Sequence, residues 1–194
     1  MELRRRDLAA DPLRQFERWF AEARDLVPAP EKMALATTDA AGAPSARMVL
    51  LKQADEHGLV FFTHAPSRKG RELAANPRAA LLFYWEPQGR QVRVEGSVEQ
   101  IAAAESDAYF ATRPLGARVG ALASRQSEPL ESRALLEQRV AELSVDDPAR
   151  PSTWGGFRVL PAAWEFWQHR DDRLHDRFRY TRSDGGWLIE RLYP

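Results

Sequence analysis

One short stretch near the C-terminus, WQHRDDRLHDR from Trp167 to Arg177, concentrates residue types that can do chemistry. It holds three arginines and two of the four histidines. On an extended segment Arg173 and His175, two positions apart, share one face and can project into one site. A solvated charged loop is the plain alternative. A metal site is the weaker interpretation, because His169 and His175 with the nearby aspartates lack a recognised ligand spacing.

A second candidate is Ser67-Arg68-Lys69, at the predicted start of a helix over residues 67–75 that Ser67 caps. Free backbone N–H groups, the helix dipole and two cations together form an anion site, and a phosphate suits it. The alternative is a surface helix with basic residues in its first turn. Cations there oppose the dipole and need a compensating reason, so the pattern slightly favours the phosphate site.

The third candidate is the apolar strand RMVLLK, residues 47–52. Because a strand alternates its faces, Arg47 and Lys52 point to opposite sides of the predicted sheet. A lysine that closes an apolar strand is unusual, and a solvated strand end is the alternative of equal weight. The polar pair Gln126-Ser127 follows an apolar helix and has no meaning on its own.

The elements that position these candidates follow from caps, turns and apolar spacing. Asp11-Pro12 begins a helix, with Asp11 as its cap and proline at the first helical position. The apolar face of this helix comprises Leu13, Phe16, Phe20 and Ala23, and the helix ends by Pro28 and Pro30.

The rest of the chain reads as strands, then helices, then strands again. Strands are predicted at residues 33–38, 47–52, 59–63, 79–85 and 90–98, the last two as a hairpin. Helices are predicted at 100–112, 116–124 and 131–143, before strands at 156–160, 164–168, 178–181 and 187–192, the last two joined by a hairpin turn. This order favours an antiparallel sheet or barrel with helices segregated to one side, and argues against alternating βα units.

Composition excludes several classes of function. The 194 residues suit one domain, and 28 basic residues against 28 acidic ones disfavour a general nucleic-acid binder. The absence of cysteine excludes disulfides, thiolate metal sites and cysteine nucleophiles. No apolar run is long enough to span a membrane, and no secretory signal is present, so we expect a cytoplasmic protein. GxGxxG, P-loop, GxSxG and HExxH motifs are absent.

Arginine outnumbers lysine by 25 to three. A GC-rich genome is the plain explanation. The alternative is that several arginines grip phosphate or carboxylate, which a planar guanidinium does through two hydrogen bonds.

The candidates and their order along the chain resemble the pyridoxine (pyridoxamine) 5′-phosphate oxidase family, from Arg4 onward. The motifs are RRRDL, ADPL, RMVLLK, FFTHAPSRKGREL, NPRAALLFYW, GRQVRVEG, YFATRP, SRQS, WGGFRV and EFWQ followed by RLHDR. The last pair is highly specific, because Trp167-Gln168 is followed after four residues by RLHDR, starting at Arg173. Trp164 departs from the aliphatic residue or phenylalanine usual in the family, which should affect packing more than chemistry.

The resemblance implies a mainly β fold with flanking helices (α+β), an FMN-binding split β-barrel of antiparallel Greek-key type. It implies a single domain over residues 1–194. Its parts are an N-terminal segment and helix at 1–30, barrel strands at 31–99, a helical segment at 100–145, and C-terminal strands with the RLHDR motif at 154–194. It also implies a homodimer with two FMN molecules at the interface, and neither a nucleic-acid nor a membrane partner.

Site residues are carried over motif by motif. The resemblance implies FMN contacts by Arg47, Met48, Val49, Leu50, Leu51, Lys52, Phe62, Thr63, Arg68, Lys69, Gln91, Gln126, Ser127, Trp167 and Arg177, with Phe62 where tyrosine is common. It implies substrate contacts by Lys52, Tyr109, Arg113, Arg173, Leu174 and His175. No metal is implied.

Two departures concern the substrate. Ala117 stands where the family has a phosphate-binding serine, so we expect weaker substrate binding rather than loss of activity. The family often has a segment before RRRDL that covers the substrate, and we expect this lid to be absent or truncated here.

The implied reaction is hydride transfer from C4′ of pyridoxine or pyridoxamine 5′-phosphate to N5 of FMN, giving pyridoxal 5′-phosphate, with oxygen reoxidising the flavin to release hydrogen peroxide. Arg173 and His175 are the predicted catalytic residues. One alternative is a same-fold oxidase of a phenazine-precursor ring, although Lys52, Tyr109 and Arg113 favour a phosphorylated substrate. Another is a flavin- or pyridoxal-phosphate-binding module without turnover, and a nucleic-acid binder is the weakest.

Overall fold

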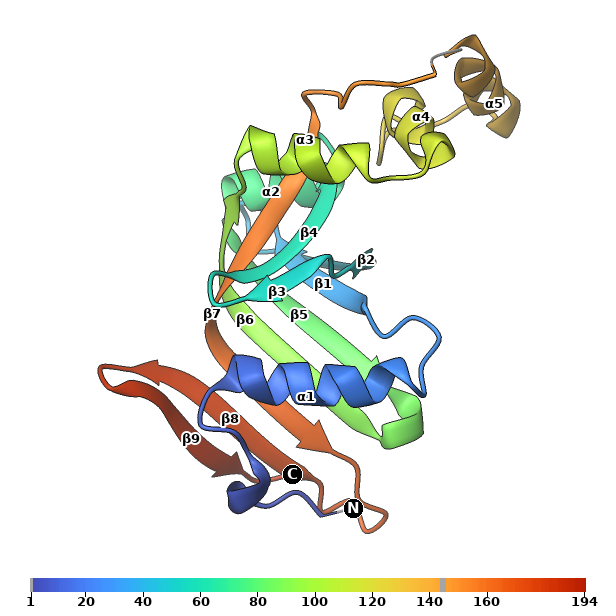
Figure 1. The fold of residues 1–194 in the computed structure, drawn as a ribbon. Coiled ribbons are helices and arrows are strands. Elements are labelled where there is room, and N and C mark those ends of the chain that lie inside the picture. Colours follow the sequence, from blue (N-terminus) through green and yellow to red (C-terminus); the bar gives the residue numbers. More distant parts are fainter. Residues whose placement is uncertain (1, 144–145) are drawn as a thin grey trace.

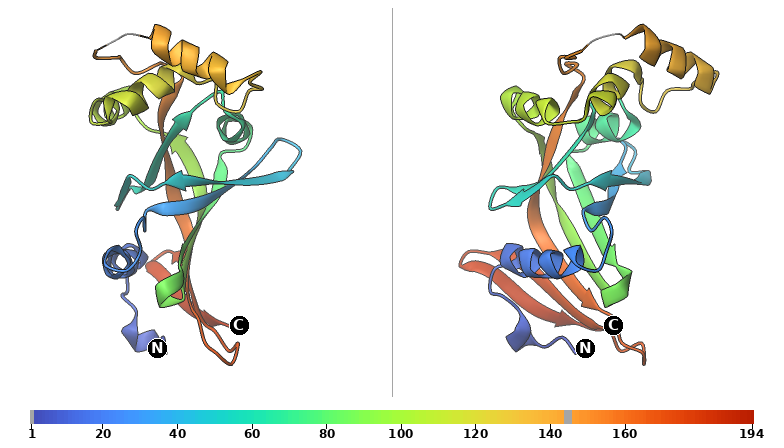
Figure 2. Two further views of the ribbon diagram at one scale, coloured as in Figure 1. Left: turned by 90° about the vertical axis from the view of Figure 1, so that its right-hand side faces the viewer. Right: turned by 45° about the vertical axis from the view of Figure 1, so that its right-hand side comes forward.

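A nine-stranded antiparallel sheet forms the body of the computed structural model, which describes residues 2–143 and 146–194 (Figure 1). Its strands are β1 (Lys32–Thr38), β2 (Pro44–Leu50), β3 (Gln53–Asp55), β4 (Gly58–His64), β5 (Arg78–Trp85), β6 (Arg90–Gln100), β7 (Trp154–Gln168), β8 (Asp176–Ser183) and β9 (Gly186–Leu192). The order is β2-β1-β5-β6-β7-β4-β3, with β8 on β7 and β9 on β8. The sheet curls into a half-barrel, as the two views in Figure 2 show.

Helices flank the sheet at different levels. They are α1 (Pro12–Arg24), α2 (Arg68–Ala75), α3 (Ala103–Ala111), α4 (Leu115–Ala123) and α5 (Arg133–Glu142). In Figure 1, α3, α4 and α5 lie at the end of the molecule opposite the β8–β9 hairpin and both termini. Met1 of the predicted segment 1–30 and the last two residues of the predicted helical segment 100–145 lie outside the described residues.

The capping predictions for α1 and α2 are confirmed. The Asp11 carboxylate accepts hydrogen bonds from the backbone N–H groups of Leu13 and Arg14, and Ser67 Oγ accepts one from Gly70. Helix α1 ends at Arg24, before the two prolines, because Asp25 already closes its last turn.

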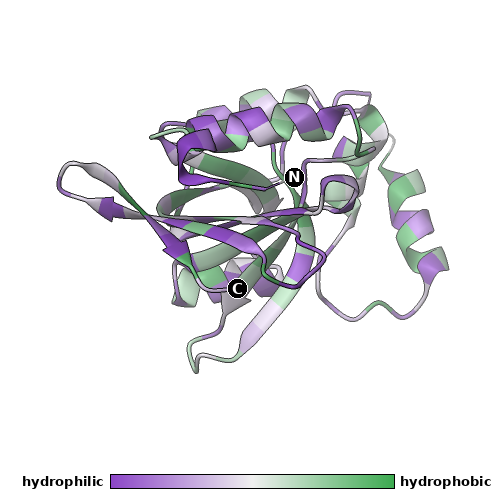
Figure 3. Ribbon diagram, turned by 90° about the horizontal axis from the view of Figure 1, so that it is seen from below, coloured by the Kyte–Doolittle hydropathy of each residue, from purple (hydrophilic) through white to green (hydrophobic). Residues whose placement is uncertain are grey.

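The main core cluster includes buried residues of α1 and of strands β1, β4, β5, β6, β7 and β8. Phe16 is fully buried against Phe83 and Trp164, with ring centroids 5.1 and 5.6 Å away. Trp19, which the predicted apolar face omitted, is buried edge-on against Phe166. Figure 3 shows hydrophobic segments gathered in the middle of the curled sheet. Trp164 is therefore a core residue, as its departure from the family pattern led us to expect.

Strand β7 corrects the prediction of two separate strands at 156–160 and 164–168. It runs unbroken from Trp154 to Gln168 through Pro161. Opposite the proline, the register with β6 shifts between Glu95 and Gly96. A bulge of this kind accommodates a residue that has no N–H to donate to the ladder. Strand β7 pairs with β4 along its first half, before the bulge, and with β8 along its second half.

Strand β2 also differs from the prediction, since it ends at Leu50 rather than at Lys52. The Leu51 N–H donates to Glu31 at 2.9 Å, and the Lys52 N–H donates to Val60 of β4 at 2.8 Å. The chain thus passes at this point from a neighbour of β1 to a neighbour of β4. Strand β3, absent from the prediction, follows directly and pairs with β4.

Candidate functional site

A groove of about 700 Å³ runs between β2, β4, α3, α4 and the segment that follows α4. Many predicted site residues line it: Arg47, Met48, Val49, Leu50, Lys52, Phe62, Thr63, Lys69, Tyr109, Arg113 and Gln126. The structure therefore brings together side chains from segments that are far apart in the sequence.

Six of the fifteen residues predicted to contact FMN lie outside this lining, namely Leu51, Arg68, Gln91, Ser127, Trp167 and Arg177. The Arg68 side chain is 59% exposed and forms an ion pair with Glu72. Leu51 is buried in the core. Ser127 is exposed and has a left-handed backbone, with φ of 77°. Contact of these residues with a cofactor stays a prediction.

Lys69 occupies one end of the groove. Its Nζ donates to Oε1 of Gln126 at 2.9 Å and to Oγ1 of Thr63 at 3.2 Å. Burial lowers the pKa of Lys69, as does Arg47, whereas Glu72 raises it. Helix α2 can come this close to β4 because Gly70 has no side chain, and a Cβ there would lie 2.1 Å from the Ala65 carbonyl oxygen. The first turn of α2 thus supplies one cation, Lys69, to this end of the groove. Phosphate binding by Ser67-Arg68-Lys69 stays a prediction.

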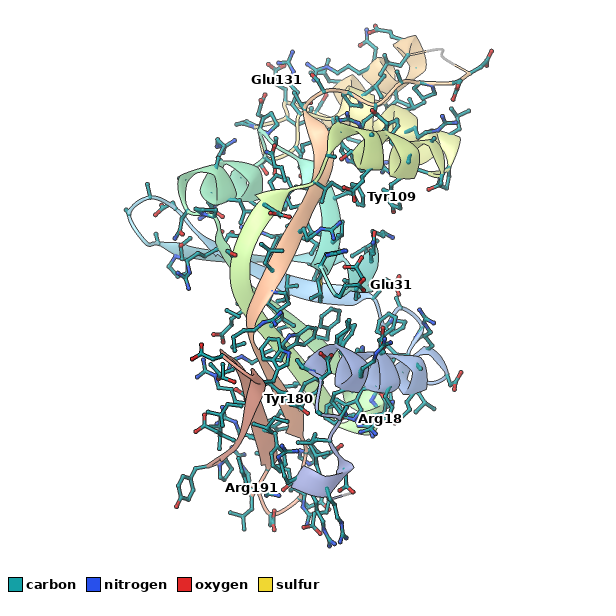
Figure 4. All side chains as sticks on the ribbon, turned by 60° about the vertical axis from the view of Figure 1, so that its left-hand side comes forward. Arg18, Glu31, Tyr109, Glu131, Tyr180 and Arg191 are labelled. Atoms are coloured by element: carbon teal, nitrogen blue, oxygen red, sulfur yellow. The ribbon has the colours of Figure 1, made fainter. Side chains whose placement is uncertain are left out.

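An aromatic wall supports the predicted substrate residues. The rings of Phe62 and Tyr109 stack with centroids 4.1 Å apart, and Trp154 stacks on Phe62 at 5.1 Å. The Arg113 guanidinium lies 4.7 Å from the centroid of Trp154, and Lys52 Nζ lies 6.0 Å from that of Tyr109. Lys52, Tyr109 and Arg113 thus line one region of the groove. Figure 4 shows Tyr109 beside α3, at the end of the molecule far from the β8–β9 hairpin.

Arg113 is poised for an anion. Its Nη1 is buried and has no hydrogen-bond partner among the described residues. Burial lowers the pKa of Arg113, and Tyr109 offsets part of this effect. A guanidinium nitrogen left without a partner in a groove is costly unless a ligand completes it. Ala117 lines the same groove on α4 and offers no hydroxyl.

His64 also lines this groove, although nothing in the sequence pattern singled it out. It is buried, and burial followed by the charges of Lys69 and Arg113 lowers its pKa. The imidazole is therefore neutral at pH 7. Only its neighbourhood in the fold, between two cations from other segments, identifies it.

A second group of predicted residues forms a row across three strands. Gln91 on β6 pairs with Trp167 on β7, and Trp167 pairs with Arg177 on β8. Residues directly opposite each other in an antiparallel sheet project from the same face. Arg177 Nε donates to Glu165 at 2.8 Å.

His175 packs on this row. Its ring centroid lies 4.5 Å from that of Trp167, and its Nδ1 accepts a hydrogen bond from the Arg170 N–H at 3.1 Å. The bond leaves Nε2 as the nitrogen that carries the proton of the neutral ring.

Residues 169–175 form a turn, which corrects the prediction of an extended segment. Arg173 has a left-handed backbone with φ of 64°, and its N–H donates to the Arg170 carbonyl at 3.1 Å. Arg173 and Leu174 are exposed, while His175 is half-buried. The turn is fixed at its start by the His169 N–H, which donates to Gly89 at 2.7 Å. The i, i+2 argument for a shared face therefore does not hold.

The groove and the RLHDR region lie toward opposite ends of the folded molecule. No predicted residue from Gln91 or from 167–177 lines the groove. Figure 4 shows Tyr109 near α3 at one end, and Tyr180 and Arg191 of β8 and β9 at the other. One chain by itself does not bring Arg173 and His175 to Lys52 and Arg113.

Within residues 2–143 and 146–194, no cluster of three potential metal-ligating side chains occurs. None of the helices in that part of the chain is both long and apolar enough to cross a bilayer.

Comparison with known proteins assigns both parts of the chain. A family model described as pyridoxamine 5′-phosphate oxidase matches residues 20–145. A second model, described as the pyridoxine 5′-phosphate oxidase C-terminal dimerisation region, matches residues 154–194. A pyridoxine/pyridoxamine 5′-phosphate oxidase of Paraburkholderia phytofirmans is 58% identical over 194 residues, which covers 97% of this chain and 91% of that protein.

Two solved structures share the fold. PhzG from Burkholderia lata, solved with tetrahydrophenazine-1-carboxylic acid, superposes with a TM-score of 0.93 at 34% identity, and the match covers 100% of this chain and 98% of that one. A pyridoxamine 5′-phosphate oxidase-related, FMN-binding protein from Nostoc punctiforme gives a TM-score of 0.77 at 21% identity, over 96% of this chain and 100% of that one. The predicted split-barrel fold is confirmed.

Proposed function

Because the chain belongs to the pyridoxine/pyridoxamine 5′-phosphate oxidase family, we propose that it oxidises pyridoxine 5′-phosphate and pyridoxamine 5′-phosphate to pyridoxal 5′-phosphate. FMN is the proposed cofactor and oxygen the proposed electron acceptor, with hydrogen peroxide as the second product.

The observation that carries this proposal is the presence of two cationic regions in one groove. Arg47 and Lys69 lie at one of them, and Lys52 and Arg113 at the other. A flavin mononucleotide and a phosphorylated substrate each carry one phosphate, so a site for both needs two such regions. The buried, unpartnered Nη1 of Arg113 fits a ligand oxygen, and the side chains present fit the proposed cofactor.

When bound, FMN would supply the hydride acceptor that no side chain provides. The chain supplies position and polarity. Lys52 and Arg113 bind the substrate phosphate and fix its orientation against the aromatic wall. His64, neutral between its cations, adds a hydrogen-bonding group without a further charge. His175 offers an Nε2–H donor, and Arg173 a cation, to the substrate ring.

We infer that the complete site is built from two copies of the chain, with FMN between them. The separation of the RLHDR region from the groove supports this inference. Apolar side chains on β2 and β5 are unusually exposed, at 63% for Met48 and 55% for Tyr84, as expected of a surface that a second copy covers. The C-terminal match to a dimerisation region supports the same homodimer.

A phenazine-related ring is the second candidate substrate. The likeness to PhzG, over the whole length of the chain, favours it. Ala117 also favours it, because a substrate without a phosphate needs no serine hydroxyl at that place. The phosphorylated substrate is preferred, since Lys52 and Arg113 are both present in the groove.

The decisive experiment is anaerobic addition of pyridoxine 5′-phosphate to the protein reconstituted with FMN, followed by flavin absorbance. Bleaching that air reverses is the expected result, and unphosphorylated pyridoxine is the matched control, which should bleach far more slowly. Bleaching by tetrahydrophenazine-1-carboxylic acid alone would favour the second candidate. A protein that binds no FMN would contradict the proposed cofactor.

A further inference from the structure

The carboxylate of Glu72 collects hydrogen bonds from three elements, although the proposed function gives it no task. It lies on α2 and is only 5% exposed. Its Oε2 accepts from Thr37 Oγ1 at 2.5 Å, Ser45 Oγ at 2.6 Å and Arg47 Nη2 at 3.0 Å. Its Oε1 accepts from Arg68 Nε at 2.8 Å. Both oxygens are therefore fully used, which is what a buried charge requires.

These bonds keep the carboxylate ionised. Burial alone would raise the pKa of Glu72, but the hydrogen bonds from Ser45, Thr37, Arg68 and Arg47 outweigh it and lower the pKa to about 2. Glu72 is thus a fixed negative charge at any physiological pH.

The consequence for Arg47 is positional. Arg47 lies on β2, at the edge of the sheet, and lines the groove. Its guanidinium also donates to the hydroxyls of Thr37 and Ser45, the same two groups that bond Glu72. A long side chain on an edge strand otherwise has several rotamers. This shared network selects one of them.

The consequence for the groove is electrostatic. Arg47, Arg68 and Lys69 are three cations around one carboxylate, which leaves two net positive charges. A phosphate monoester carries up to two negative charges near neutral pH. Glu72 also raises the pKa of Lys69, against the effects of burial and of Arg47, and so helps to keep that amine protonated.

We propose that Glu72 is a positioning residue for the phosphate end of the cofactor, holding Arg47 toward the groove and setting the charge of the cation cluster. The inference rests on the proposed function, because it takes the ligand at this end of the groove to be the phosphate of FMN.

The test compares two flavins on the apoprotein by fluorescence quenching: FMN, which carries the phosphate, and riboflavin, which does not. Glu72→Gln should lower FMN affinity about tenfold and leave riboflavin affinity unchanged. Glu105→Gln is the matched control, because Glu105 accepts a hydrogen bond from Arg158 at 3.1 Å and does not line the groove. This variant should bind both flavins as the wild type does.

A double-mutant cycle separates positioning from general stability. Arg47→Gln should give the same FMN-selective loss, and adding Glu72→Gln to it should cost little more, because both act through one contact. If Glu72→Gln does not fold, Arg47→Gln alone serves as the test, and it should show an FMN-selective loss of affinity.

Other outcomes overturn the inference. Equal weakening of FMN and riboflavin would show a merely structural role, and unchanged FMN binding by Glu72→Gln would exclude any role. A wild-type protein that binds neither flavin would overturn the proposed cofactor and this inference together. The failure of this inference alone is recognised by a wild-type protein that binds FMN and a Glu72→Gln variant without an FMN-selective loss.

Discussion

The Nζ atom of Lys69 lies 2.9 Å from the Oε1 atom of Gln126, although 57 positions separate the two residues in the chain. This contact ties the first turn of α2 to the segment after α4 across one end of the groove. Two residues that the family motifs assign to the cofactor are therefore in direct contact in the fold.

Lys69→Met should weaken FMN binding while sparing riboflavin. A hydrogen bond to a charged group contributes about 1.5–3 kcal/mol, or roughly a ten- to hundredfold change in affinity. Flavin fluorescence quenching measures both ligands. Lys32→Met, at an exposed lysine of β1, is the matched control. Wild-type FMN affinity in Lys69→Met would contradict the assignment of this end to the phosphate.

Arg173→Ala and His175→Ala should lower turnover while FMN stays bound. In the proposed site both residues orient the substrate ring, His175 as a hydrogen-bond donor and Arg173 as a cation. Loss of this positioning is expected to cost about a hundredfold in rate. Steady-state peroxide release and bound-flavin absorbance measure the two effects. His169→Ala, in the same turn, should keep near wild-type turnover. Loss of flavin in both variants, without a selective effect on rate, would count against the assignment.

Mixing two impaired variants, assayed at an FMN concentration that saturates the wild-type protein but not Lys69→Met, tests the shared site. Lys69→Met and the double variant Arg173→Ala/His175→Ala each damage both sites of their own dimers. If each site takes the groove from one protomer and the turn from the other, a mixed dimer regains one intact site. After unfolding and co-refolding in equal amounts, about a quarter of wild-type activity should return. Activity that stays at the level of the separate variants would place each site within a single chain.

Ala117→Ser should lower the Michaelis constant for pyridoxine 5′-phosphate. The new hydroxyl lies in the groove that Arg113 also lines, and a hydrogen bond to a charged phosphate contributes about 1.5–3 kcal/mol, or tenfold and more in binding. Steady-state kinetics with both phosphorylated substrates measure the effect, and Ala108→Ser on the exposed side of α3 is the control. An unchanged Michaelis constant would show that the missing serine is not felt.

The buried Tyr180 predicts a loss of stability in alkali. Its hydroxyl donates to the Ala9 carbonyl at 2.8 Å, and burial raises its pKa from the usual value of 10.0 to about 12. Because the folded pKa is the higher one, this stabilisation is fully present below pH 10 and is lost as the pH rises toward 12. Urea unfolding at pH 7, 10 and 11.5 should show a steeper decline for the wild type than for Tyr180→Phe.

The same substitution should cost about 0.5–1.5 kcal/mol at pH 7 through the lost hydrogen bond. Tyr193→Phe, at a side chain that is almost fully exposed, should leave both the stability and its pH dependence unchanged. Identical alkaline profiles for wild type and Tyr180→Phe would contradict the prediction.

Local signals determined much of the fold. Asp11 and Ser67 predicted the starts of α1 and α2, because a capping side chain bonds to the backbone of its own helix within three residues. Alternation along β2 predicted that Arg47 and Val49 face one side and Met48 the other, since side-chain direction in a strand depends on the local pleat alone. The family motifs likewise named most of the groove lining.

Only the tertiary structure decided how these parts meet. Pro161 looked like a break, yet β7 continues because its extra residue, Ala162, forms a bulge opposite Glu95 and Gly96 of β6. Arg173 and His175 looked extended, yet contacts from Gly89 and Arg170 fold their segment into a turn. His64 and Glu72 lie within the motif FFTHAPSRKGREL, but no role was predicted for them. Their surroundings include groups from distant segments, since Arg47 is 25 positions from Glu72 and Arg113 is 49 positions from His64. Side-chain direction in a strand and helix capping depend on neighbouring residues, so the sequence predicts them. The environment of a buried charge depends on distant groups that only the fold brings near it.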